Sequence, residues 1–367
     1  MDYLKDLQKI IEINSFTKNK EGVDKVGAQM TEWLELIGLE TQRFQRESIG
    51  DHLLFKSPKC EGAKILLLGH NDTVFPYGAF DKYHEDEEWV YGPGVCDMKG
   101  GNIVALEALK EVFIKNKEIK NIDFFLVSDE ESGSDDSKAL TLELSKDYDY
   151  CFVFEAAGLD LEVVTARKGV GTYTMSIEGK AAHAGVRYAH GINANLEAAY
   201  KLQKLTELTN LEIGTTVNVG KIEGGIGANT ISPKCELLLE IRFTTESERD
   251  RVLNALEEIT NTSYVQGTKA TLDGLIQRDV MEANEKQNSF IKQLESISGY
   301  DIKTESRGGV SDANHVASQG VITLDGFGPF GDGDHTIHER ALKSSFTQRI
   351  DMMSKILLHH QNNNYNF

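Results

Sequence analysis

The chain has 367 residues, which exceeds the size at which one hydrophobic core keeps growing, so two domains are expected. Hydrophobic residues make up 40% and charged residues 26% of the sequence, as in ordinary soluble globular proteins. The formal net charge of −19 argues against nucleic acid or an anionic membrane surface as a partner, because like charges repel at long range.

The N-terminal segment and the cysteines indicate the compartment. The segment MDYLKDLQKIIEINSF is amphipathic and lacks the basic stretch and apolar run of a secretory signal. No apolar segment approaches the roughly 20 residues that span a bilayer. The four cysteines are scattered without a CxxC pair, as is typical of reduced thiols. We therefore predict a cytoplasmic protein.

The N-terminal part of the chain shows the pattern of an α/β layered domain. Helical spacing of apolar residues predicts helices over residues 2–13 and 22–38. Near-continuous apolar runs of strand length follow at 64–70, 122–128 and 148–154, with a helix-like stretch at 100–113 between the first two. Such runs suit parallel strands buried on both faces, and their alternation with helices indicates α/β layers.

The pattern changes between residues 165 and 282. The order strand, helix, strand, strand, helix, strand is predicted there, at 169–179, 193–208, 214–221, 235–243, 246–259 and 268–273. This order is that of a ferredoxin-like α+β domain. Beyond it we expect a helix at 285–298, a strand at 321–328 and a closing helix at 344–360. We therefore predict a small domain, residues 166–282, inserted into a larger one formed by 1–165 and 283–367.

Potential metal ligands follow each of the three apolar strands. His70 and Asp72 end the first, Glu130 and Glu131 follow the second, and Glu155 follows the third. In open α/β sheets, sites form beyond the carboxyl ends of the strands, so these side chains are expected in one crevice. Two further candidates stand in glycine-rich loops: Asp97 in GPGVCDMKGG, and His335 or His338 in GPFGDGDHTIHER.

Each of these residues alone has an ordinary explanation, such as a structural histidine or a solvated acidic turn. Together they are hard to explain by packing, because burying several carboxylates costs several kcal/mol each without a compensating cation. Two histidines and three carboxylates form a ligand set that zinc accepts. Five ligands exceed the need of one tetrahedral zinc with an open position, but they suit two zinc ions that share a bridging carboxylate. Cobalt or manganese could serve in the same ligands.

These motifs resemble those of the co-catalytic zinc exopeptidases and deacylases. That family contains bacterial glutamate carboxypeptidase, aminoacylase, acetylornithine deacetylase and succinyl-diaminopimelate desuccinylase. The resemblance covers essentially the whole chain, in the order GHNDTV, GPGVCDMKGG, DEESGS, FEAA, GKAAHAG, GGIGANTISP, RGGVSDANH and GDGDHTIHE. It implies a zinc-peptidase-like catalytic domain, with a mixed sheet flanked by helices, and an inserted dimerisation or lid domain.

The resemblance implies a role for each candidate ligand. Asp97 would bridge two zinc ions, His70 and Glu155 would hold one of them, and Glu131 and His335 the other. His335 is preferred to His338 because the family pattern places a glutamate four residues after the histidine, and Glu339 stands there.

Two further residues next to these ligands would take part in the reaction. Glu130 would be the general base, taking a proton from a metal-bridged water and passing it to the leaving amine. Asp72 would accept a hydrogen bond from the His70 imidazole and fix its tautomer. A cis peptide bond between Asp97 and Met98 is also implied.

The resemblance also suggests residues that contact the substrate. His183 would reach the substrate of the partner subunit and stabilise the tetrahedral oxyanion, which implies a homodimer. The other candidates would hold a free carboxylate or line its pocket: Asn229, Arg242, Gly309, Ser311 and Arg278. For Arg278, a surface position is an equal alternative.

The chain resembles glutamate carboxypeptidase most, so we expect a metallo-carboxypeptidase that releases a C-terminal amino acid. An N-acyl amino acid deacylase of the acetylornithine deacetylase or desuccinylase type is the alternative. A non-catalytic binding module is disfavoured because every ligand position and Glu130 are intact. A serine or cysteine hydrolase is also disfavoured, since no GxSxG motif occurs.

Overall fold

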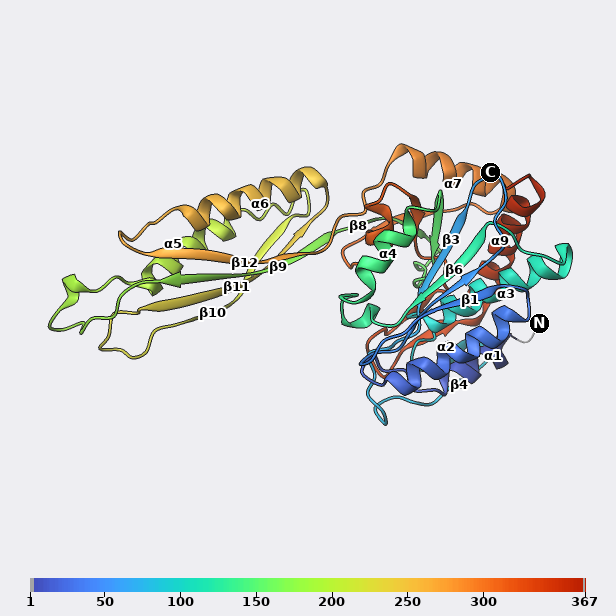
Figure 1. Cartoon of the computed structure of the whole chain (residues 1–367), viewed down its shortest axis with the longest axis horizontal. Helices are drawn as coiled ribbons and strands as arrows, with labels where there is room; N and C mark the ends of the chain where they lie inside the picture. Colours follow the sequence, from blue (N-terminus) through green and yellow to red (C-terminus); the bar gives the residue numbers. More distant parts are fainter. Residues whose placement is uncertain (1–2, 366) are drawn as a thin grey trace. The chain divides into compact units, whose positions relative to one another are not determined.

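The computed structural model describes residues 3–365 and 367, and it divides into two compact units (Figure 1). The larger unit comprises the chain up to Ala166 together with Ala283–Arg307 and Ser311–Phe367. The smaller unit comprises Arg167–Glu282 and Gly308–Val310. Each unit has its own hydrophobic core.

A six-stranded mixed sheet forms the centre of the larger unit. Its strands lie in the order β1 (Glu40–Phe44), β2 (His52–Lys56), β6 (Ile122–Val127), β3 (Ile65–His70), β7 (Tyr150–Val153) and β14 (Ile322–Leu324). From β6 to β14 neighbouring strands run parallel, whereas β1 and β2 are antiparallel to their neighbours. Every residue of β3 and β6 is buried, which confirms the interpretation of these apolar runs as strands covered on both faces.

Helices pack around this sheet and against each other. The N-terminal helices are α1 (Tyr3–Ile11) and α2 (Lys20–Glu35). Helix α3 (Lys99–Asn116) packs against β3, α1 and the C-terminal helix α9 (Lys343–Asn362). The shorter helices are α4 (Ser137–Ser145), α7 (Glu285–Ser298) and α8 (Ala313–Ala317). None of the described helices is long and apolar enough to cross a membrane.

The smaller unit has a four-stranded antiparallel sheet. Its strands lie in the order β10 (Thr216–Gly224), β11 (Lys234–Phe243), β9 (Gly169–Glu178) and β12 (Lys269–Arg278). Helices α5 (Ala194–Thr206) and α6 (Glu246–Asn261) connect β9 to β10 and β11 to β12. This topology is the ferredoxin-like arrangement that the order of predicted elements indicated.

Several strands of the larger unit were not predicted. Strands β1 and β2 are absent from the sequence-based interpretation, as is β8 (Val163–Arg167), which pairs with β13 (Thr304–Arg307). A second four-stranded sheet was also missed, formed by β15 (Gly331–Asp332), β16 (Arg340–Leu342), β5 (Trp89–Tyr91) and β4 (His84–Glu85). The strand predicted at 321–328 is shorter than expected, because the chain turns at Gly326, whose φ of +78° is unfavourable for other residues.

Acid is expected to destabilise the larger unit through His360, a buried residue of α9. Burial lowers the pKa of this imidazole to about 4, although its hydrogen bond to the carbonyl oxygen of Ala63, at 2.9 Å, opposes the shift. An unfolded histidine titrates near 6.5, so between these values the unfolded chain binds more protons than the native one. The stabilisation is therefore complete above about pH 6.5 and is lost as the pH falls toward 4, by up to about 3 kcal/mol.

Urea unfolding at pH 7 and pH 4.5 measures this effect. The decrease in the free energy of unfolding between the two values should be smaller in His360→Gln than in the unchanged protein. His359→Gln, which alters the neighbouring and less buried histidine of the same helix, serves as the control. An equal decrease in all three proteins would show that His360 does not carry the acid sensitivity.

Candidate metal centre

The candidate ligands lie at one edge of the sheet of the larger unit. His70 is the last residue of β3, Glu130 and Glu131 begin a short 3-10 turn after β6, and Glu155 lies two residues beyond β7. The three strands are parallel neighbours, so their carboxyl ends meet at the same edge. Their order in the sheet is what gathers side chains from three distant parts of the sequence.

The gathered residues form two groups that share one carboxylate. In the first group, Nε2 of His70 lies 3.2 Å from Oδ1 of Asp97 and 3.8 Å from Oε1 of Glu155. In the second, Nε2 of His335 lies 3.3 Å from Oδ2 of Asp97 and 3.1 Å from Oε2 of Glu131. The ligand atoms within each group lie within 4.8 Å of one another. His338 belongs to neither group.

The electrostatics of this cluster are those of carboxylates crowded together with little water. Burial and the neighbouring Asp97 raise the pKa of Glu131 to about 8 and that of Glu155 well above its usual range. Hydrogen bonds to Asp97 and Glu131 raise the pKa of His335 to about 11. Burial disfavours ionisation of Asp97 itself, but hydrogen bonds from His335 and His70 outweigh it and lower the pKa of this carboxyl. These pKa shifts favour the protonated forms of Glu131 and Glu155 and the ionised form of Asp97.

The same two groups of residues could each hold a divalent cation. Each group offers one imidazole nitrogen and carboxylate oxygens from two residues, with the two oxygens of Asp97 directed to different groups. Nitrogen and oxygen donors of this kind suit zinc and neighbouring divalent metals. The charge of two cations would compensate the three carboxylates, of which Glu131 and Glu155 have raised pKa values beside Asp97.

The loop that carries Asp97 is held by a buried glutamate. Glu339 is 1% exposed and accepts hydrogen bonds from the backbone N–H groups of Gly94, Cys96 and Asp97, at 2.9, 3.0 and 3.1 Å. The peptide bond between Asp97 and Met98 is cis. Cys96 is buried, and burial together with Glu339 raises the pKa of its thiol well above the usual range, so it is not a reactive thiolate.

Asp72 links the two sides of the centre. Nδ1 of His70 lies 3.0 Å from the backbone carbonyl oxygen of Asp72 and 3.3 Å from its carboxylate. That carboxylate also accepts hydrogen bonds from the backbone N–H groups of Glu130 and Glu131, at 3.3 and 3.2 Å. The expected contact between Asp72 and the imidazole is therefore present, but the backbone oxygen makes the shorter approach.

Other residues that orient the centre were not predicted as functional. The hydroxyl of Thr17 donates to Asp72 at 2.6 Å, and the side-chain amide of Asn102 donates to the carbonyl oxygen of His70 at 2.7 Å. The ammonium of Lys99 is fully buried and donates to the carbonyl oxygens of Ile10 and Ile13, which ties the end of α1 to the start of α3. Lys99 follows the CDM sequence directly and Asn102 stands four residues after Met98, which was a usable signal, whereas nothing in the sequence singles out Thr17.

Two of the predicted substrate residues lie together in the smaller unit. His183 forms an isolated β-bridge with Thr230, and the backbone N–H of Ala184 donates to the carbonyl oxygen of Asn229 at 2.9 Å. His183 and Asn229 are both exposed. They therefore stand side by side on the surface of this unit.

Arg242 and Gly309 also belong to the smaller unit. Arg242 pairs with the exposed carboxylate of Glu240, with Nε to Oε1 at 2.8 Å, and donates to the carbonyl oxygen of Gly308 at 3.0 Å. Gly309 is exposed, and its carbonyl oxygen accepts a hydrogen bond from Arg167 at 3.2 Å. Arg242 is thus placed beside the glycine pair of the RGGVSD motif.

Ser311 and Arg278 differ from what the sequence suggested. Ser311 is 1% exposed, and its hydroxyl donates to Asp325 at 2.7 Å inside the larger unit, so it does not line an exposed pocket. Its backbone N–H donates to Asn314 at 3.0 Å, which makes Ser311 part of the start of α8. Arg278 ends β12 and is buried, so a surface position is wrong.

Comparisons with known proteins agree with this geometry. Residues 165–268 match the family model described as peptidase dimerisation domain, M20 type. Carboxypeptidase G2 of a Pseudomonas strain is 26% identical, with 97% of this chain and 88% of that protein covered. Succinyl-diaminopimelate desuccinylase of Psychrobacter arcticus is 26% identical over 90% of this chain and 86% of its own length.

Solved structures share the fold over nearly the whole chain. The aminopeptidase PepT of Bacillus cereus superposes with a TM-score of 0.82 at 22% identity, with 97% of both chains covered. An M20 family metallo-carboxypeptidase of Sulfolobus solfataricus gives a TM-score of 0.69 at 14% identity, covering 98% of this chain and 99% of that one. The predicted resemblance is thereby confirmed: the chain is similar to metallopeptidases and deacylases of the M20 type over nearly its whole length, and residues 165–268 match their dimerisation domain.

Proposed function

We propose that the protein is a metal-dependent carboxypeptidase that hydrolyses the amide bond before a C-terminal amino acid, as glutamate carboxypeptidases do. The observation that carries this proposal is the pair of ligand groups sharing Asp97, next to Glu130. Similarity to carboxypeptidase G2 over 97% of the chain supports the substrate class.

Glu130 is proposed as the general base. When bound, two divalent cations would act as Lewis acids that polarise the scissile carbonyl and favour ionisation of the attacking water. Glu130 takes a proton from that water as its oxygen forms a bond to the carbonyl carbon. It then gives this proton to the amine nitrogen as the C–N bond breaks. Asp72 holds the backbone of Glu130 and Glu131 together, so the base and an adjacent ligand keep a fixed spacing.

Zinc is the metal we propose for both positions. His70 and Glu155 would hold one ion, Glu131 and His335 the other, and Asp97 would bridge them. The mixture of imidazole and carboxylate donors also admits cobalt or manganese.

Recognition of the free carboxylate is assigned to Arg242 and Asn229. A guanidinium fork pairs well with a carboxylate, and Arg242 lies beside the exposed Gly308 and Gly309. Its present partner, Glu240, is on the surface, so a substrate carboxylate would replace a weak exposed pair. Arg278 is not favoured for this role because it is buried at the end of β12.

Arg242→Ala should raise KM for substrates with a free carboxylate by about tenfold or more, because a hydrogen bond to a charged group contributes about 1.5–3 kcal/mol. Steady-state kinetics on a dipeptide and on its C-terminal amide measures the effect. The variant should lose most of its preference for the free acid. Arg251→Ala, which removes another arginine of the smaller unit, is the control and should keep that preference. An unchanged preference in Arg242→Ala would assign carboxylate recognition elsewhere.

We also propose that the protein works as a homodimer in which His183 serves the active site of the partner subunit. The matched dimerisation domain and the exposure of His183 support this proposal. The imidazole would donate a hydrogen bond to the oxyanion of the tetrahedral intermediate.

Mixing two inactive variants tests this role. In a hybrid of His183→Ala and Glu130→Ala protomers, one of the two active sites would have both residues intact. After subunit exchange, an equal mixture should therefore regain about a quarter of the original activity, since half of the dimers are hybrids. Exchange is verified with differently tagged protomers. Complete exchange without recovered activity would show that His183 acts within its own chain or not at all.

A deacylase of N-acyl amino acids is the second candidate, favoured by the similarity to succinyl-diaminopimelate desuccinylase at the same identity. The site chemistry is the same in both cases, and only the group on the acyl side differs.

A substrate panel separates the two functions. Zinc-loaded protein is incubated with dipeptides varied at the C-terminus and with matched N-acetyl and N-succinyl amino acids, and amino acid release is measured with and without a chelator. Chelator-sensitive cleavage of the dipeptides, best with C-terminal Glu or Asp, is the expected result. Cleavage of the N-acyl set alone would establish the deacylase. No cleavage of any substrate by protein with two metals bound would favour a non-catalytic binding protein.

A further inference from the structure

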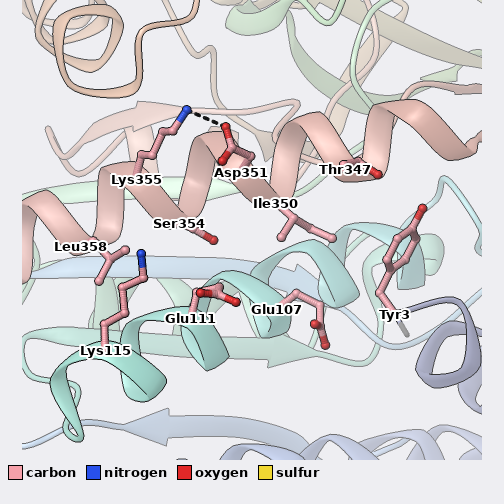
Figure 2. Close-up of a pocket in the computed structure, with 10 residues that line it drawn as sticks. All are labelled: Tyr3, Glu107, Glu111, Lys115, Thr347, Ile350, Asp351, Ser354, Lys355 and Leu358. Atoms are coloured by element: carbon pink, nitrogen blue, oxygen red, sulfur yellow. Dashed lines mark ion pairs between the residues drawn. The ribbon is translucent and has the colours of Figure 1, made fainter. Parts of the chain in front are cut away.

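Ionisable side chains outside the metal centre differ in how deeply they are buried. The groove between α3 and α9 is lined by groups that reach solvent, such as the pair of Lys355 and Asp351 at 2.7 Å (Figure 2). Both side chains are nearly half exposed, so this pair contributes little to stability. His52 is different, because its side chain is fully buried and both ring nitrogens contact polar groups. It takes no part in the proposed reaction, so these contacts need another explanation.

The two ring nitrogens of His52 contact the two ends of one loop. Ser128 comes directly after β6, and its backbone N–H donates to Nδ1 at 3.2 Å. Asp136 comes directly before α4, and its Oδ1 lies 2.9 Å from Nε2. A backbone N–H can only donate, so Nδ1 is the acceptor and Nε2 carries the proton that is donated to Asp136. Both ends of residues 128–136 are therefore fastened to the same imidazole.

This loop carries the proposed general base and one of the candidate ligands. Glu130 and Glu131 lie between its two ends, and their backbone N–H groups donate to Asp72. The carboxylate of Asp129 accepts a hydrogen bond from the backbone N–H of Asp136 at 2.8 Å, which closes the loop a second time. The loop thus keeps its own shape, and its place relative to the sheet depends on the contacts that Asp72 and His52 make with it.

The sheet fixes the position of His52. It is the first residue of β2, which pairs antiparallel with β6 and has Leu53 opposite Leu126. This register brings His52 to the carboxyl end of β6, where the loop begins. Leu53 and Leu54 are buried next to it, so packing holds the strand and the ring in place. His52 therefore joins the loop to a rigid element.

A serine, a histidine and an aspartate in contact could also form a nucleophilic triad. Ser128 is fully buried, and its hydroxyl donates to the carbonyl oxygen of Gly50. This hydroxyl lies 3.0 Å from Nδ1 of His52, whereas the aspartate contacts Nε2. In hydrolases of the triad type the serine contacts Nε2 and the aspartate contacts Nδ1. Burial and the reversed order both exclude a nucleophilic role for Ser128.

We propose that His52 is a positioning residue for the reaction. By joining Ser128 to Asp136, it holds Glu130 and Glu131 at the positions that proton transfer and metal binding require. This inference rests on the proposed roles of these two glutamates. A displacement of about 1 Å in a catalytic group can reduce the rate about a hundredfold, so the support need only fail slightly to be measurable.

Three substitutions of His52 in the zinc-loaded protein separate its two contacts. In His52→Asn the amide oxygen takes the place of Nδ1 and can still accept from Ser128, but the contact with Asp136 is lost. In His52→Gln the amide nitrogen takes the place of Nε2 and can still donate to Asp136, but Ser128 loses its acceptor. His52→Phe removes both contacts. We expect kcat to fall about tenfold in the first two variants and about a hundredfold in the third, with KM within about twofold of the original.

Asp136→Ala removes one of these contacts from its other side. The side chain of Asp136 is 41% exposed, so the variant should fold. Its kcat should fall about tenfold, and adding His52→Asn should cause little further loss, because both substitutions remove the same contact. Arg46→Ala is the matched control, since it removes the surface partner of Asp136 and leaves the imidazole in place. It should keep the original kcat.

Hydrogen exchange of residues 128–137, followed by mass spectrometry, reports on the loop even without turnover. His52→Phe should exchange the amides of this segment at least tenfold faster than the unchanged protein, while exchange in β3 stays the same. If the unchanged protein hydrolysed none of the substrates, the proposed function would fail, whereas faster exchange would still support the hold of His52 on the loop.

Three results would overturn the proposal. The first is an original kcat in both His52→Phe and Asp136→Ala. The second is full additivity of His52→Asn and Asp136→Ala, because the two residues would then act independently. The third is a loss of activity in the His52 variants that follows only the unfolded fraction, with kcat per folded molecule and loop exchange unchanged. His52 would then stabilise the fold without positioning Glu130.

Discussion

Glu130→Gln is expected to reduce kcat by about a thousandfold while the protein keeps both metal ions, since general acid–base catalysis contributes roughly 10²–10⁴-fold. The amide has nearly the shape of the carboxylate but cannot take a proton from water. The backbone N–H of residue 130 would still donate to Asp72, so the ligand Glu131 should stay in place. KM should change little, because the loss concerns the transition state rather than ground-state binding.

The measurement is steady-state hydrolysis of the best substrate, together with metal content by mass spectrometry. Asp135→Asn is the control, because Asp135 is an exposed acid in the same loop region that belongs to neither ligand group. It should retain both the metals and the activity. If Glu130→Gln turned over at the original rate, the proton transfer would have to be assigned to another residue.

Asp97→Asn is expected to lower the metal content from two ions per chain to less than one. Asp97 is the only residue among the described ones that belongs to both ligand groups, with one oxygen directed to each. The amide carries no charge and offers a single good acceptor oxygen, so one cation position would lose this ligand and the other would keep only a weaker neutral one. Activity should be lost together with the metals.

Metal content after dialysis against metal-free buffer measures this effect, and circular dichroism verifies that the variant is folded. Glu155→Gln is the matched comparison, because Glu155 belongs to the first group only. This variant should keep more metal than Asp97→Asn does. If Asp97→Asn retained two ions per chain, as the unchanged protein is expected to do, the bridging role of Asp97 would be contradicted.

The larger sheet was predictable where burial left a clear pattern. Strands β3 and β6 are buried along their whole length and stand out as apolar runs. Strand β1, the sequence ETQRF, is largely exposed at the edge of the sheet, so neither alternation nor an apolar run marks it. The strands β4, β5, β15 and β16 have two or three residues each, which is too short for any periodicity.

The candidate ligands were predictable because the fold places them at strand ends and in glycine-rich loops. His70 and Glu155 end apolar runs, and Asp97 stands between glycines. Their supporting contacts were less accessible, because they join residues far apart in the sequence. Thr17 and Asp72 are 55 residues apart, and Glu339 is 242 residues from Asp97. Such partners follow from the folded structure rather than from local spacing.

The misplacement of Ser311 has a similar cause. The sequence RGGVSD suggests an exposed loop, and Gly309 is indeed exposed. Two residues later the chain enters the interior, where the Ser311 hydroxyl meets Asp325 and its backbone N–H meets Asn314. The chain enters the interior here because α8 begins at Ala313. The sequence did not reveal this helix.

The most direct test of the central claim is a titration of chelator-treated protein with zinc, in which bound metal and hydrolysis of the preferred dipeptide are followed together. The arrangement of His70, Asp97, Glu131, Glu155 and His335 predicts two tightly bound ions per chain, with full activity only when both are present. Hydrolysis that persists without metal, or binding that saturates at a single ion with full activity, would contradict the two-metal centre.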